Sequence, residues 1–129
     1  MSAPAATSVA AALLAILIVP LSLLVSAHRL RLGGVVFGDA GDEGLRRRIR
    51  AHGNFTEYAP TLLLTLALVE LAGAPAAFVT ALAVAVVGGR LLHAVGMLWF
   101  ETPAPRGVAM LATHGVYLLG GGWLLWHFA

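Results

Sequence analysis

The sequence of 129 residues contains no cysteine and no lysine. Without a thiol, the chain can form no disulfide and can carry out no cysteine-based catalysis of its own. Charge is also scarce, because only 11% of the residues are charged whereas 60% are hydrophobic, well above the roughly 45 to 50% of soluble domains. This composition indicates an integral membrane protein.

All eight basic residues are arginines, and the net charge is only +2. They lie beside apolar stretches, without the basic, aromatic-interleaved surface that is typical of nucleic-acid binding. A metal site is not indicated either, because His93, His114 and His127 show no paired ligand spacing and neither HEXXH nor CXXC occurs. The arginines instead point to membrane orientation and anion binding.

Four long, mostly apolar stretches predict four membrane-spanning helices in one domain that covers residues 1 to 129. A hydrocarbon core of about 30 Å requires roughly 20 apolar residues in a helix, and each stretch comes close to that length. We expect helices over Ala10 to Ala27, Glu43 to Ala72, Pro75 to Phe100 and Gly107 to Ala129. The expected fold class is therefore an all-α integral membrane protein built as a four-helix bundle.

The connections between these stretches have clear turn chemistry. Residues 33 to 44 are rich in glycine and acidic residues, which favours an irregular loop with Asp42 as the N-cap of the second helix. The sequence GAP at 73 to 75 predicts a tight turn, and residues 101 to 105 are expected to form a break between the third helix and the fourth.

The first helix is expected to remain in the mature chain. The first 27 residues of the chain carry no charge, whereas a secretory signal begins with a basic segment and has a shorter apolar core. Pro20 is expected to kink it, and Pro60 to kink the second helix. Cleavage after Ala27 is the alternative.

Arginine placement predicts the orientation in the membrane. Seven of the eight lie at or beside the first and third connections, namely Arg29, Arg31, Arg46, Arg47, Arg48, Arg50 and Arg106. By the positive-inside rule these connections face the cytoplasm. An even number of spans then places both termini on the other side, which is the periplasm if the protein resides in a bacterial inner membrane.

The second expected helix carries a polar stripe in otherwise apolar surroundings. Arg47, Arg50, Asn54 and Glu57 follow one another at steps of three, four and three, so they share one helix face. Glu57 lies about 10 Å along the axis from Arg50, where an unpaired carboxylate is costly, and Arg90 is its expected partner. One interpretation is a site for a zwitterionic ligand. The other is a collar of snorkelling arginines with one buried ion pair between two helices.

The third expected helix places Arg90, His93 and Met97 on one face. His93 is either a ligand or base in a site, or a histidine that is hydrogen-bonded inside the bundle. The spacing alone does not decide between these interpretations.

Four parts of the chain match motifs of one known family. In the second helix the matching residues are Arg50, Ala51, His52, Asn54, Glu57, Tyr58 and Pro60. The others are HRLRLG at 28 to 33, GRLLHAVG at 89 to 96, and Arg106, which falls where the prostaglandin-E synthase branch has its catalytic arginine. Together these resemble the MAPEG family, the membrane-associated proteins in eicosanoid and glutathione metabolism, and within it the short bacterial branch.

The resemblance implies a homotrimer of four-helix subunits that binds glutathione in a cytoplasmic-side pocket between neighbours. The residues then expected to bind glutathione are Arg29, Arg50, Asn54, Glu57, Tyr58, Arg90 and His93. Arginines suit its two carboxylates and Glu57 suits its ammonium group, while Asn54 would hydrogen-bond the tripeptide backbone.

Arg106 is the catalytic residue that the resemblance implies. A cysteine-type thiol has a pKa near 8.5, so only a few per cent is thiolate at pH 7. A guanidinium that lowers this pKa by about 1.5 stabilises the thiolate by about 2 kcal/mol. The implied activity is that of a glutathione transferase or peroxidase acting on lipophilic electrophiles or hydroperoxides that arrive from the bilayer.

Three positions depart from the pattern of the eicosanoid-specific members. Met97 replaces a tyrosine and Gly107 replaces a serine after Arg106, which disfavours an isomerase. Gly53 replaces an arginine, which predicts fewer contacts with glutathione and weaker affinity. Two alternatives from other classes remain. One is a small proton-coupled exporter, although the first helix lacks the acidic residue that such exporters use. The other is a trimeric scaffold with the same fold and no activity.

Overall fold

The computed structural model describes residues 4 to 129, which form four α-helices and, within that range, no strand. In chain order they are α1 Ala5–Arg31, α2 Glu43–Leu71, α3 Ala76–Trp99 and α4 Ala104–Phe128. The predicted all-α, four-helix fold is therefore confirmed.

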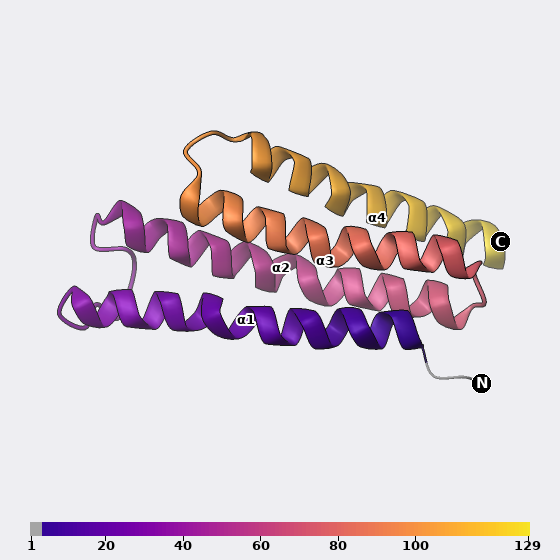
Figure 1. The fold of residues 1–129 in the computed structure, drawn as a ribbon, viewed down its shortest axis with the longest axis horizontal. Helices are drawn as coiled ribbons and strands as arrows, with labels where there is room; N and C mark the ends of the chain where they lie inside the picture. The colour runs from indigo at the N-terminus through magenta and orange to yellow at the C-terminus, as the bar shows by residue number, and fades with distance from the viewer. Residues whose placement is uncertain (1–3) are drawn as a thin grey trace.

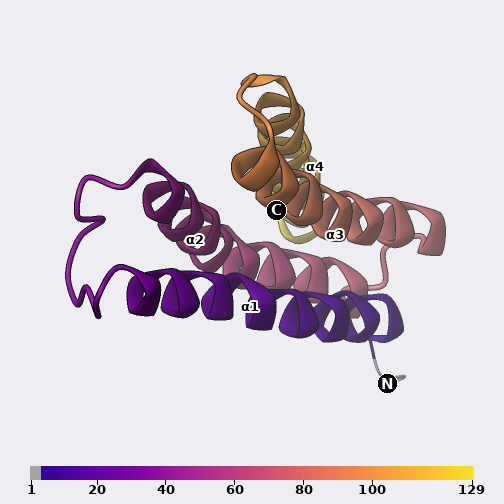
Figure 2. The same cartoon turned by 60° about the vertical axis from the view of Figure 1, so that its left-hand side comes forward.

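The helices lie side by side and alternate in direction (Figure 1). The α1–α2 and α3–α4 connections lie at one end of the bundle, while the α2–α3 turn lies at the other end with the start of α1 and the end of α4. Helices α2 and α3 are central: α2 packs against the other three helices, and α1 and α4 share no contact among the described residues. Figure 2 shows α4 on the far side of α3 from α1.

Two helix boundaries differ from the sequence-based expectation in ways that affect the site. α1 continues to Arg31, so Arg29 belongs to its last turn. α4 begins at Ala104, and the expectation of a break that lasts to Pro105 is wrong, because proline is well tolerated in the first turn of a helix. Arg106 therefore lies in the first turn of α4. The predicted cap of α2 is confirmed, since an Asp42 side-chain oxygen accepts a hydrogen bond from the Leu45 N–H at 2.6 Å.

The outer surface of the bundle is strongly apolar. Helices α1, α3 and α4 are each long and apolar enough to cross a membrane. The first half of α2 carries many charges and does not have the composition of a membrane-spanning segment. Large exposed side chains recur every seven residues, at Val9, Ile16, Leu23 and Leu30 on α1 and at Leu111, Leu118 and Leu125 on α4. Rows of exposed apolar side chains of this length fit contact with lipid or with other membrane protein.

Small residues set how closely the helices approach, as is common between membrane helices. A Cβ atom added at Gly120 would lie 2.9 Å from Thr65 Cγ2, so α4 packs directly on α2 at this point. Around it the core is closed by Leu62, Leu66 and Val69, which are fully buried.

A carboxylate at the end of α2 caps the start of α1. Glu70 accepts hydrogen bonds from the backbone N–H groups of Ala6 at 2.9 Å and Thr7 at 2.8 Å, and from the Thr7 hydroxyl at 2.7 Å. The first N–H groups of a helix have no partner within it, and the N-cap residue Pro4 supplies no side-chain hydrogen bond. Glu70 therefore satisfies the start of α1 and fixes its register against α2.

Candidate ligand site on helix α2

The structure divides the predicted site residues into an inner cluster and an outer face. Asn54, Tyr58, Arg90 and His93 lie between the helices, whereas Arg50 and Glu57 lie on the exposed side of α2. Arg29 and Arg106 lie at the arginine-rich end, at the close of α1 and the start of α4.

The inner cluster is organised around Arg90, which is only 1% exposed. Its Nη1 donates to Asn54 Oδ1 at 2.7 Å, and its Nη2 donates to the hydroxyl of Thr113 on α4. The guanidinium carbon also lies 5.2 Å from the centre of the Tyr58 ring, within the range of a cation–π contact. A buried cation is thus held by neutral groups from α2 and α4, and its Nε has no hydrogen-bond partner among residues 4 to 129.

The expected ion pair between Arg90 and Glu57 is wrong. Asn54 lies on the side of α2 that meets α3, so its amide oxygen reaches Arg90 first. Glu57, three residues later, lies on the exposed side, because each residue turns a helix by about 100°. In place of a buried ion pair between the two helices, the structure has a hydrogen bond from the charged Arg90 guanidinium to the neutral Asn54 amide.

The bond to Arg90 also sets which way the Asn54 amide presents its groups. An arginine only donates, so Asn54 must turn its oxygen toward Arg90 and keep its N–H groups for another partner. Asn54 is half-buried, so these N–H groups are available to an acceptor on a ligand.

The outer face carries two opposite charges without internal partners. Among residues 4 to 129, neither Arg50 nor Glu57 forms a side-chain hydrogen bond or an ion pair within hydrogen-bonding distance. Both are exposed, and Glu57 lies near the middle of α2. A carboxylate that lies inside a membrane is costly unless it meets a partner, and among the described residues Glu57 meets none.

Arg106 lies at a close contact between α3 and α4 at the arginine-rich end. Its Nη1 contacts the Met97 sulfur at 3.6 Å. Gly96 permits this approach, since a Cβ there would lie 3.0 Å from Pro105 Cβ and 3.2 Å from Arg106 Cγ. His93 is buried on α3, one turn before Met97. Within the described residues no carboxylate pairs with Arg106, so its charge is available to an anion.

Arg29 is already engaged by the backbone of the α1–α2 connection. Its Nη1 donates to the carbonyl oxygens of Val35 at 3.0 Å and Val36 at 2.8 Å. Its visible role in the single subunit is therefore to hold this connection, and its expected contact with a glutathione carboxylate stays a prediction.

Two residues of the cluster were missed by sequence reasoning, Thr113 and Tyr117. Thr113 is 1% exposed and accepts from Arg90 while donating to the Ala109 carbonyl oxygen at 2.9 Å. The hydroxyl of Tyr117 donates to the Tyr58 carbonyl oxygen at 3.3 Å. The available signal was a polar residue inside an apolar helix, which usually has a partner in the bundle.

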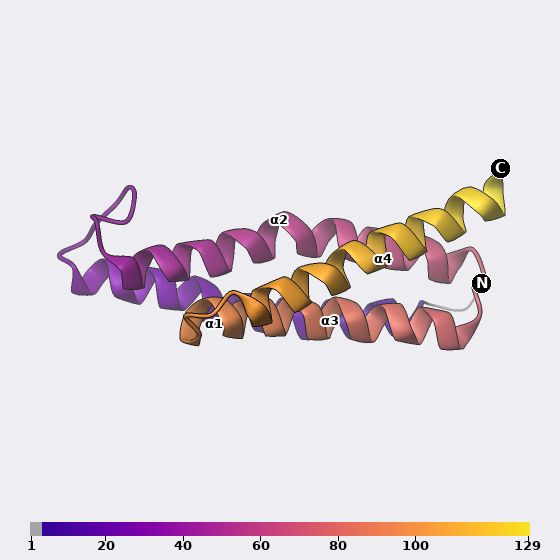
Figure 3. The same ribbon diagram turned by 90° about the horizontal axis from the view of Figure 1, so that it is seen from above.

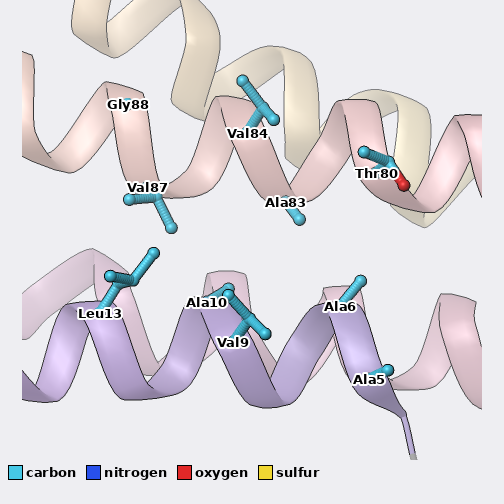
Figure 4. A pocket seen from close by; sticks show the side chains of 10 residues that line it. All are labelled: Ala5, Ala6, Val9, Ala10, Leu13, Thr80, Ala83, Val84, Val87 and Gly88. Carbon is cyan, nitrogen blue, oxygen red and sulfur yellow. The ribbon is translucent and has the colours of Figure 1, made fainter.

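One apolar crevice lies away from these groups. It is a space of about 540 Å³ between α1 and α3, lined by small and apolar residues such as Ala6, Ala10, Ala83 and Gly88 (Figure 4). A smaller crevice of about 330 Å³ between α1 and α2 includes Ser22 and His52. Residues 4 to 129 contain no cluster of three His, Asp or Glu side chains arranged to hold a metal ion. The polar site is therefore defined by charge rather than by a closed pocket within one subunit.

Comparison with known proteins places the chain among membrane proteins. The model of the MAPEG family matches residues 7–126. Two curated relatives, both called inner membrane protein YecN and found in Escherichia coli strains K12 and CFT073, are 36% identical to the chain over 62 residues. That segment is 48% of this chain and 47% of each relative, so the match spans about half the length of the curated relatives. No solved structure shows significant similarity.

Proposed function

Because the chain belongs to the MAPEG family, we propose that this membrane protein binds glutathione and acts as a transferase or peroxidase on lipophilic electrophiles or hydroperoxides. Glutathione would supply the nucleophilic sulfur. The residues of the chain would bind the tripeptide, hold the sulfur as a thiolate and keep the reaction next to the bilayer.

The observation that carries the proposal is the exposed, unpaired Glu57 near the middle of α2. A lipid-facing carboxylate at that depth costs roughly 2.5 to 3.5 kcal/mol by insertion scales. A neighbouring subunit that covers this face, with a cationic ligand group beside Glu57, would remove that cost. This reasoning supports a homotrimer with the site between subunits.

The groups on this side of α2 suit a zwitterionic peptide. Glu57 would take the ammonium group of glutathione, and Arg50, about 10 Å nearer the arginine-rich end, would take a carboxylate by bidentate hydrogen bonds. The free N–H groups of Asn54 would donate to a carbonyl or carboxylate oxygen. Three complementary groups on one helix favour a peptide over a simple anion.

Arg106 would act on the sulfur. It is a half-buried guanidinium whose Nη1 contacts the Met97 thioether, a group that brings no charge of its own. A cation in such partly desolvated surroundings favours the thiolate over the thiol. The thiolate sulfur would then bond to an electrophilic carbon of the second substrate, and the leaving group would depart with its electron pair.

On this proposal the arginine-rich connections would face the cytoplasm, as expected from the excess of arginine that cytoplasmic connections carry. The apolar exterior of the bundle would give a lipophilic substrate direct access from the bilayer.

Calorimetric titration of glutathione into the detergent-purified protein tests the proposal. Saturable binding is expected for the wild type, and the double variant Arg50→Ala, Glu57→Ala should lose it. Glu101→Gln, an exposed carboxylate in the α3–α4 connection, is the matched control and should bind normally. Absence of binding by the intact wild-type protein would overturn the proposal.

The variant Arg106→Ala separates binding from chemistry. Its glutathione affinity should stay within a fewfold of wild type, while turnover at pH 7 falls about tenfold or more, because the thiol pKa returns toward about 8.5. The rate should recover as pH rises toward that value. Equal losses of affinity and turnover would contradict this division of roles.

A proton-coupled exporter is the second candidate, because a mid-membrane carboxylate such as Glu57 can also carry a proton. In that case Glu57→Gln would abolish proton-driven efflux from proteoliposomes, and glutathione would not bind.

A further inference from the structure

The connection between α1 and α2 is a folded loop held at both ends. At its start Arg29 donates to the carbonyl oxygens of Val35 and Val36. At its far end the Asp39 carboxylate pairs with Arg46, and that hydrogen bond holds the pKa of the Asp39 carboxyl below its ordinary value, so the pair stays charged at neutral pH. In Figure 3 the loop stands off the ends of the two helices.

The middle of this loop presents apolar side chains to the outside. Val36 is 71% exposed and Phe37 is 89% exposed, and Leu30 in the last turn of α1 is 74% exposed. Scattered exposed apolar residues need no explanation, but a cluster on a loop fixed by hydrogen bonds indicates a contact surface.

The surroundings of this tip are basic. The loop and the adjoining helix ends carry six arginines against three carboxylates: Arg29, Arg31, Arg46, Arg47, Arg48 and Arg50, with Asp39, Asp42 and Glu43. Arg31 is exposed and forms no ion pair among the described residues. Apolar side chains flanked by arginines are the pattern that binds the headgroup layer of anionic lipids.

We propose that the tip formed by Val36 and Phe37 inserts into the headgroup layer on the arginine-rich side, with Arg31 against a lipid phosphate. A neighbouring copy is the less suitable partner, because in one membrane every copy presents the same basic end and like charges repel. Lipid phosphate carries the complementary charge. This contact would fix how deeply the arginine-rich end of the bundle, where α2 begins, lies in the membrane. The proposed lipid contact does not depend on glutathione binding.

The absence of cysteine from the chain makes the test direct. Nitroxide labels are attached to the single-cysteine variants Val36→Cys and Phe37→Cys, with Thr102→Cys as the matched control in the exposed α3–α4 connection at the same end. Spin-label accessibility to oxygen and to a water-soluble nickel chelate is measured in vesicles of phosphatidylethanolamine and phosphatidylglycerol. Both loop labels should be reached by oxygen and shielded from nickel, whereas the label at Thr102 should show the reverse.

Replacing phosphatidylglycerol by phosphatidylcholine, or introducing Arg31→Gln into the labelled variants, should raise nickel access at Phe37→Cys at least twofold. Nickel access at both loop labels equal to that at Thr102 would overturn the proposal. Shielding from both reagents, together with spin–spin broadening between copies, would also overturn it in favour of a contact between subunits.

Discussion

Arg90 is the residue on which the interior depends most. It is a buried cation, yet its partners are an amide, a hydroxyl and an aromatic ring rather than a carboxylate. Removing one acceptor leaves a buried N–H of the guanidinium without a hydrogen bond, which costs more than the net contribution of the bond itself. Because the Asn54 oxygen accepts from Arg90, the N–H groups of the same amide are left to donate to another acceptor.

Substitutions of Asn54 separate its hydrogen bond to Arg90 from the proposed role of its N–H groups in binding a ligand. Asn54→Leu should lower the free energy of unfolding by about 2 to 3 kcal/mol, because Arg90 loses an acceptor. Asn54→Asp should keep or raise stability, since it offers Arg90 a carboxylate, but it should weaken glutathione binding, because its second oxygen repels an acceptor. Thermal unfolding in detergent and calorimetry measure the two effects, with the exposed Thr80→Val as control. Equal destabilisation by both exchanges would contradict the bond to Arg90.

Glu70 is the second residue with a clear energetic role. Replacement by glutamine removes the charge from three hydrogen bonds at the start of α1 and should cost about 1 to 2 kcal/mol of stability. Thermal unfolding measures the effect, and Glu101→Gln provides the control. A Glu70→Gln variant as stable as that control would show that the cap contributes little.

Among the elements, the junction of α3 and α4 places Arg106. The variant Gly96→Ala should push the first turn of α4 away from α3, because the new methyl group would meet Pro105 and Arg106. We expect a loss of about 1 to 3 kcal/mol in stability, as in other overpacked contacts, and a larger loss in turnover than in glutathione affinity.

Gly88 provides the matched control on the same helix, since a Cβ there meets no atom within 4 Å. Gly88→Ala should leave both stability and turnover near wild type. If the two variants behaved alike, the close contact at Gly96 would not be what positions Arg106.

The elements also show how far sequence reasoning reaches. The α2 cap at Asp42, the loop before it and the turn at 73 to 75 follow from local chemistry, and the structure has them where expected. The start of α4 was missed because a proline marks either a break or a first turn, and only packing against Gly96 decides between them. The same limit applies to Arg90: spacing defines a helix face to within about 60°, which does not distinguish Asn54 from Glu57 as its partner.

At the scale of the whole molecule, the described chain presents two kinds of surface, one polar and one apolar. Its polar face on α2 and its apolar exterior cannot both face lipid without cost. The number of helices and the end that gathers the arginines were predictable, because composition and periodicity encode them. The pairs of helices in contact, including the lack of contact between α1 and α4 within the described residues, could not be predicted. No local sequence pattern specifies which helices pack together.

An assembly that covers the polar face of α2 should be measurable directly. The single-cysteine variant Thr61→Cys, one turn beyond Glu57 on the exposed side, should crosslink between copies in native membranes, whereas Leu118→Cys on the outer row of α4 should crosslink much less. Native mass spectrometry should report three subunits. A monomer, or crosslinking of both variants to the same extent, would contradict a trimer built around α2.

The hydrogen bonds between Glu70 and the first turn of α1 also bear on how the protein is made. They join residues 6 and 7 to residue 70, so both partners exist once the first two helices have left the ribosome. Chains begin to fold from the N-terminus during synthesis, and this pair of helices can align itself before α3 emerges. The first hairpin would then enter the bilayer as a preassembled template onto which α3 and α4 are added.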